Sequence, residues 1–142
     1  MNVAIIGSGS WATALAKIVM HNTSEINWHI RKQETIDEFV EIRRNPNHLE
    51  WAYFDVSRIH FSADINAVIE QSDLLVLAIP SPYLKQSLND ITVDMSQKMV
   101  ISAVKGMIPD ENLLVTEYLH KYFNVPNDNL GVIAGPCHAE EI

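Results

Sequence analysis

Two glycines near the start of the chain form a pattern that could bind a ligand through its backbone. Gly7 and Gly9 follow the short apolar run Val3 to Ile6, and small and apolar residues at helical spacing begin at Ala12. Strand, glycine turn and helix in this order are typical of a diphosphate site. Gly7 permits a tight turn, Gly9 has no Cβ to keep a phosphate away, and Ala12 lets the helix lie close to the strand. Because the first N–H groups of a helix have no internal partners, we expect them to bind a dinucleotide here. A glycine turn without a ligand is the alternative.

A basic pair follows the next predicted strand, residues 26–30, where dinucleotide-binding domains contact the adenosine ribose. An acid at this place, about 20 residues past the glycines, accepts hydrogen bonds from the ribose of NAD, whereas a basic residue suits the 2′-phosphate of NADP. The chain has Arg31 and Lys32 here, and no acid before Glu34. A guanidinium binds phosphate oxygens through paired hydrogen bonds. We therefore expect NADP to be preferred and NAD also to be used, the alternative being a solvated basic pair at a helix start.

Three further positions lie at the ends of predicted elements. Pro80 follows the buried run Leu74 to Ile79, and ligands of open α/β sheets collect outside such strand ends, although a plain strand-to-helix turn explains the composition equally well. Lys105 ends a second apolar strand, where an ammonium group could bind an anionic substrate or polarise a carbonyl oxygen. A surface lysine in a loop is the alternative there. Cys137 lies near a helix start that would favour a thiolate, with an inert small residue as the alternative.

These residues require a scaffold in which strands and helices alternate. The continuously apolar run Leu74 to Ile79 predicts a strand buried on both faces, and so a parallel sheet covered by helices. The alternation predicts an α/β fold with a doubly wound, mostly parallel sheet in a single domain, residues 1–142. The predicted strands are 3–6, 26–30, 58–61, 74–79, 99–102 and 129–134, and the predicted helices are 10–21, 33–44, 64–69, a segment ending at Asn89, 112–123 and one opening at Pro136.

Composition excludes several classes of protein. The net charge of −8 argues against a nucleic-acid or anionic-membrane surface, and no apolar run approaches membrane-spanning length. The single cysteine rules out an internal disulfide and fits a reducing compartment, so we expect a cytoplasmic protein. The six histidines show no metal-ligand spacing, and no metal site is expected. The last predicted helix has only about seven residues before Ile142, so we expect the chain to be cut just after the dinucleotide-binding domain of a longer protein.

As a set, these patterns resemble the bacterial-type NAD(P)-dependent glycerol-3-phosphate dehydrogenases. The matching segments keep the family's order and are 7–15, Arg31, Asn45-Pro46, 78–81, 102–106 and 135–142. The resemblance implies a Rossmann-type dinucleotide-binding domain, with a helical second domain that is absent from this chain. It also implies reversible hydride transfer between NAD(P)H and dihydroxyacetone phosphate, giving sn-glycerol 3-phosphate for phospholipid synthesis. The partners it implies are this small-molecule substrate and, as an option for the full-length protein, a second copy in a homodimer.

The resemblance also carries residue roles to matching positions. The positions similar to cofactor contacts are Ser10, Trp11, Arg31, Lys105 and Ala139, and those similar to substrate contacts are Lys105, Gly135 and Cys137. Cys137 replaces the usual serine or threonine and His138 the usual aromatic residue, so only backbone contacts are expected to be kept at 137. The segment 48–51 departs from the usual continuation after Asn45-Pro46. The proton-transferring lysine is expected beyond Ile142, so no catalytic residue is assigned within the chain, and we expect dinucleotide binding with little or no turnover.

Two alternatives of other kinds stay open. A reductase with a related nucleotide domain, acting on ketopantoate or a 3-hydroxy acid, would share the glycine turn. It would not be expected to carry the segments 102–106 and 135–141 together. A non-catalytic dinucleotide sensor would require Ile142 to be the natural end of the chain, and the short last helix argues against this.

Overall fold

The sheet that carries the predicted site has six parallel strands. The computed structural model describes residues 1–104, 107–108 and 110–133. The strands are β1 (Val3–Ile6), β2 (Ile26–His29), β3 (Ile59–Ser62), β4 (Leu74–Leu77), β5 (Met99–Ser102) and β8 (Leu130–Val132). Their order across the sheet is β3-β2-β1-β4-β5-β8, and every neighbouring pair is parallel. The predicted doubly wound α/β sheet is confirmed.

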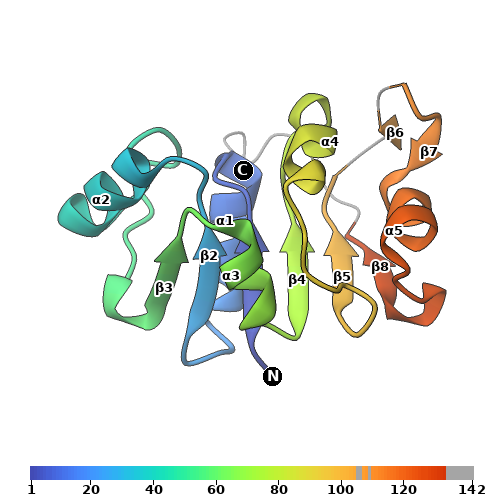
Figure 1. Cartoon of the computed structure of the whole chain (residues 1–142). Helices are drawn as coiled ribbons and strands as arrows, with labels where there is room; N and C mark the ends of the chain where they lie inside the picture. The colour runs from blue at the N-terminus through green and yellow to red at the C-terminus, as the bar shows by residue number, and fades with distance from the viewer. Residues whose placement is uncertain (105–106, 109, 134–142) are drawn as a thin grey trace.

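Helices cover both faces of this sheet (Figure 1). One face packs on α1 (Ser10–Val19) and α2 (Gln33–Ile42), and the other packs on α3 (Ile65–Glu70), α4 (Ser81–Asn89) and α5 (Val115–Phe123). Short 3-10 turns at Val56–Arg58 and Asn127–Asn129 precede β3 and β8. A hydrophobic core lies on each face of the sheet, and successive strand residues such as Ile5 and Ile6 pack into opposite cores. Across the described ranges, none of the helices has the length and apolar character needed to cross a membrane.

The strand order reverses beside β1. The chain runs from β1 outward through β2 and β3, then returns to pair β4 with the other side of β1. The helices that follow β1 and β4 therefore pack on opposite faces, and the turns leading into them diverge. In open α/β sheets, the crevice at such a reversal, outside the carboxyl ends of the strands, is where ligands bind.

Burial along β2 exceeds what its sequence suggests. Apolar and polar residues alternate here, yet all four residues of the strand are buried because helices cover both faces. The two polar side chains find partners: Asn27 Nδ2 donates to Ser72 Oγ at 2.8 Å, and His29 Nδ1 lies 3.0 Å from the Ser62 carbonyl oxygen. Burial lowers the pKa of His29 below its ordinary value, against the opposing effect of that hydrogen bond.

The predicted helix 112–123 begins later than its periodicity indicates. Asp110 and Asn112 adopt left-handed backbone conformations, with φ of 70° and 55°, which a helix does not accommodate. The residues Leu113–Leu114 form β7, which pairs antiparallel with β6 (Met107–Ile108). The helix starts at Val115, and the Glu117 carboxylate accepts a hydrogen bond from Leu114 N at 2.9 Å. The predicted start at residue 112 is therefore wrong, and Leu114 is 47% exposed.

Other boundaries move by one to three residues, as expected where strand and helix ends fray. The strand predicted at 58–61 occupies Ile59–Ser62, and the one predicted at 74–79 ends at Leu77. The helix predicted at 64–69 is confirmed as α3, and Asp64 caps it, because Asp64 Oδ1 accepts from Asn66 N at 3.0 Å and Ala67 N at 3.4 Å. The helix predicted to open at Pro136 lies outside the described residues.

Candidate dinucleotide-binding site

Gly7 makes the turn after β1 possible. Its φ of +128° is a conformation that side chains rarely adopt, and a Cβ added there would lie 2.5 Å from the Ala78 carbonyl oxygen. Ala78 directly follows β4, so the absence of a side chain at Gly7 is what lets the carboxyl ends of β1 and β4 approach. The predicted role of Gly7 in the turn is confirmed, and so is the close packing of Ala12, which is fully buried in the core under α1.

Side chains of the scaffold bind three successive carbonyl oxygens of the turn. The donors and acceptors are Trp28 Nε1 to Gly7 O at 2.7 Å, Asn45 Nδ2 to Ser8 O at 2.9 Å, and Thr13 Oγ1 to Gly9 O at 2.7 Å. The C=O and N–H groups of a trans peptide point in opposite directions. The N–H group that shares each of these peptide units therefore points away from the scaffold.

The start of α1 is also open on the side to which these N–H groups point. No side chain caps the helix at Gly9, and the first turn contains no acidic residue. Within the described part of the chain, the N–H groups of Gly9, Trp11 and Ala12 have no hydrogen-bond partner. A Cβ added at Gly9 would meet no atom within 4 Å. Unpartnered donors at a helix start, with free space beside Gly9, suit an anion such as a phosphate.

The loop after α2 reaches back to this turn. Asn45 is fully buried beside Ser8 and Thr13, and Ser10 Oγ lies 3.0 Å from His48 Nδ1. Neither loop residue was assigned to the site from the sequence: Asn45 was named only within a segment that matches the family, and His48 only within a segment that departs from it. Asn45 is 37 residues from Ser8 in the sequence, and no local pattern identifies Ser8 as its partner.

Arg31 and Lys32 lie on the surface just after β2. Gly7 N donates to the His29 carbonyl oxygen at 3.3 Å, so the end of β2 adjoins the glycine turn. Arg31 lines a pocket of about 240 Å³, and no described residue forms a hydrogen bond or ion pair with its guanidinium. The residues that line this pocket are His29, Arg31, Ala63, Asp64, Ile65, Asn66, Ser87 and Asp90. An exposed cation beside a pocket at the carboxyl edge fits the predicted contact with the adenosine end.

The structure places several predicted site residues along one edge of the sheet. The glycine turn, the pair Arg31–Lys32 and the exposed Pro80 follow the carboxyl ends of the parallel strands β1, β2 and β4, and the arrowheads of β2 and β4 point to one edge in Figure 1. The four remaining predicted contacts lie outside the described residues, and they are Lys105, Gly135, Cys137 and Ala139.

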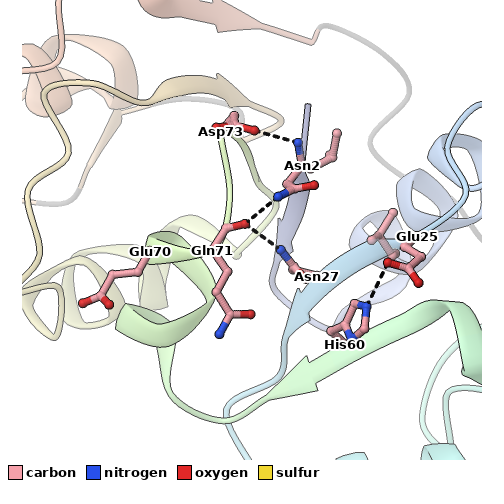
Figure 2. Close-up of a pocket in the computed structure, with 9 residues that line it drawn as sticks. Asn2, Glu25, Asn27, His60, Glu70, Gln71 and Asp73 are labelled. Carbon is pink, nitrogen blue, oxygen red and sulfur yellow. Dashed lines mark hydrogen bonds and ion pairs between the residues drawn. The ribbon is translucent and has the colours of Figure 1, made fainter.

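A larger hollow of about 500 Å³ lies at the opposite, amino-terminal edge (Figure 2). Its lining includes the carboxylates of Glu25, Glu70 and Asp73, and Glu25 Oε2 lies 3.2 Å from His60 Nε2. Figure 2 shows this ion pair and the hydrogen bonds that link Asn2 to Asp73 and to the Gln71 carbonyl. Because this hollow lies at the edge opposite the glycine turn and the carboxyl ends of the strands, size alone does not identify the dinucleotide site.

The family-model match and the similar sequences of known proteins point to the same family. The family model described as the N-terminus of NAD-dependent glycerol-3-phosphate dehydrogenase matches residues 2–142. The chain is 31% identical to the NAD(P)+ glycerol-3-phosphate dehydrogenase of Oceanobacillus iheyensis, covering 99% of the chain and 40% of that protein. It is 30% identical to that of Staphylococcus epidermidis, covering 99% of the chain and 42% of that protein. A solved structure of Plasmodium falciparum glycerol-3-phosphate dehydrogenase matches with a TM-score of 0.82 and 27% identity, over 99% of the chain and 42% of that structure. The chain thus spans about 40% of the length of these relatives.

Proposed function

The chain belongs to the NAD-dependent glycerol-3-phosphate dehydrogenase family, matching its N-terminal part, and we propose that it is the dinucleotide-binding domain of an enzyme that forms sn-glycerol 3-phosphate. That enzyme would transfer a hydride between NAD(P)H and the carbonyl carbon of dihydroxyacetone phosphate, in support of phospholipid synthesis. The observation that carries the proposal is that the N–H groups of Gly9 and Trp11 have no partner among the described residues, in the crevice where the strand order reverses.

The residues present fit a dinucleotide. The N–H groups of Gly9 and Trp11 would bind the diphosphate, and the space over Gly9 would let it approach the backbone. Pro80 would line the far side of the crevice, where α4 begins. When bound, the reduced nicotinamide supplies the hydride; the protein's part in this domain is to hold and orient the cofactor.

Arg31 and Lys32 support a preference for NADP. Both are exposed at the end of β2, and Arg31 has no protein partner among the described residues. A guanidinium free to form paired hydrogen bonds suits the 2′-phosphate that distinguishes NADP from NAD. NAD would still bind through the glycine turn, because that part of the site does not contact the 2′ position.

The substrate side of the proposal rests on family membership. Lys105 would contact both cofactor and substrate, Ala139 the cofactor, and Gly135 and Cys137 the substrate. The proton-transferring lysine and the helical domain that carries it would be supplied by sequence outside these 142 residues. We also propose a cytoplasmic location, supported by the single cysteine, and a homodimer for the full-length enzyme.

Two assays on the purified 142-residue chain test the proposal. Calorimetric titration with NADPH and with NADH is expected to show one site that binds NADPH more tightly. The same chain is expected to oxidise little or no NADPH when dihydroxyacetone phosphate is added. Absence of binding to both dinucleotides would overturn the cofactor assignment. Full-length enzyme that reduces ketopantoate or a 3-oxo acid in preference to dihydroxyacetone phosphate would favour the related reductases instead.

A further inference from the structure

We propose that Asn45 is a positioning residue for the cofactor diphosphate: through Thr13 it fixes the peptide orientations of the glycine turn so that donors face the ligand. The inference rests on the proposed dinucleotide binding and deepens it. Asn45 itself would touch no part of the cofactor, because its side chain is fully buried behind the turn.

Hydrogen bonds determine the orientation of the Asn45 amide. Nδ2 donates to the Ser8 carbonyl oxygen and to Thr13 Oγ1, each at 2.9 Å. Oδ1 accepts from Asn47 N at 2.9 Å. Both donors and the acceptor of the amide are thus engaged, and a rotated amide would place an oxygen against the Ser8 carbonyl.

Thr13 extends this arrangement by one residue. Its Oγ1 accepts a hydrogen bond from Asn45 Nδ2 and donates one to the Gly9 carbonyl oxygen at 2.7 Å. Two successive carbonyls, those of Ser8 and Gly9, are therefore bound on the scaffold side. If the peptide between Ser8 and Gly9 rotated, a carbonyl oxygen would face the crevice in place of the Gly9 N–H donor and would repel a phosphate.

A turn that is already oriented binds an anion better than one that must be ordered on binding. The effect of Asn45 should therefore depend on the diphosphate. ADP carries this group and adenosine lacks it, so the ratio of the two affinities measures the contribution of the oriented amides. General unfolding or loosening of the domain would weaken both ligands together.

Asn27 offers a matched control. It too is a buried asparagine that donates to a hydroxyl and a backbone carbonyl, with Nδ2 at 2.8 Å from Ser72 Oγ and 3.3 Å from the Gln71 oxygen. It lies at the opposite, amino-terminal edge of the sheet, in the hollow of Figure 2. Its loss should destabilise the chain without changing the diphosphate site.

The experiment compares Asn45→Leu and Asn27→Leu with the unchanged 142-residue chain. Leucine is similar in size, removes the donors and adds no charge. We expect Asn45→Leu to weaken binding of NADPH and ADP by about 10- to 100-fold, the range for lost hydrogen bonds to a charged group, and to leave adenosine unchanged. Asn27→Leu should lower the thermal midpoint and leave all three affinities unchanged. Equal weakening of ADP and adenosine by Asn45→Leu would overturn the inference.

A second pair of variants covers the case in which Asn45→Leu does not fold. Thr13→Val keeps the shape of the side chain and removes the hydroxyl, so the ratio of ADP to adenosine affinity should fall as it does for Asn45→Leu. Thr13→Ser keeps the hydroxyl and should restore the ratio. If Thr13→Val binds ADP as the unchanged chain does, the inference is wrong while the proposed function stands. If the unchanged chain binds no dinucleotide, the proposed function fails and the inference fails with it.

Discussion

Replacing Gly9 by alanine should separate ligand binding from stability at this site. Gly9 has φ of −77° and ψ of −172°, an extended conformation that alanine adopts without strain, and its Cβ would meet no atom within 4 Å. The folded chain therefore has room for the methyl group. That same space is where the diphosphate would approach the backbone, so the methyl group should keep the ligand out.

The expected effect on stability comes from two small opposing changes. Alanine restricts the unfolded chain and stabilises the fold by about 0.4–1 kcal/mol. Alanine is also a poorer residue than glycine at the start of a helix, where losing a good cap costs about 0.5–1 kcal/mol. The free energy of unfolding should thus change by less than about 0.5 kcal/mol, as for a surface substitution. Binding of NADPH should weaken by about 1.5–3 kcal/mol, because hydrogen bonds to a charged group are lost.

Urea denaturation followed by circular dichroism measures the first quantity, and calorimetric titration with NADPH measures the second. Gly7→Ala is the matched comparison, because its Cβ would lie 2.5 Å from the Ala78 carbonyl oxygen at a φ of +128°. It should lower the free energy of unfolding by at least about 1–3 kcal/mol, the cost of such backbone strain, before the clash is added. If Gly9→Ala bound NADPH as tightly as the unchanged chain, the ligand would not lie over Gly9.

Three further predictions concern the elements beside the turn. Arg31→Ala should weaken NADPH binding by about 1.5–3 kcal/mol and NADH binding much less, and equal loss of both in titrations would refute the contact with the 2′-phosphate. Trp28→Phe leaves the partly buried Gly7 carbonyl without its 2.7 Å donor, so urea denaturation should show a loss of about 0.5–1.5 kcal/mol, and unchanged stability would contradict this. Because burial lowers the pKa of His29 below its ordinary 6.5, the unfolded chain binds the proton more readily, and stability should fall as the pH drops from 6.5 toward the folded pKa. His29→Gln should flatten that part of the pH profile in urea denaturation, and an unaltered slope would show that other groups cause it.

Local patterns in the sequence were sufficient for the elements that frame the site. The apolar run of β1, the glycines after it and the small residues of α1 predicted the strand, turn and helix, all of which are confirmed. The run Leu74 to Ile79 predicted a strand buried on both faces, and from this a parallel sheet. The structure has both, as β4 and as the parallel pairs of the sheet. In each case the deciding interaction is between near neighbours or depends only on apolar periodicity.

Contacts between distant segments could not be predicted in this way. Asn45 lies 37 residues from Ser8, and the Trp28 indole lies 21 residues from Gly7, so no spacing rule pairs them. The helical spacing of Leu113 and Leu114 predicted too early a helix start. The left-handed backbone of Asn112 and the pairing of Leu113–Leu114 as a strand are not visible in that spacing. The roles of Lys105, Gly135, Cys137 and Ala139 stay predictions from the family resemblance.

Nuclear magnetic resonance of the 15N-labelled 142-residue chain, titrated with NADPH, tests the central claim most directly. The account predicts that the amide signals of Gly9, Trp11 and Ala12 shift together with increasing NADPH. The amides of Asn27 and Glu70, at the acidic hollow on the opposite edge, should keep their positions. Shifts confined to that hollow, or no shift at the glycine turn at saturating NADPH, would contradict the account.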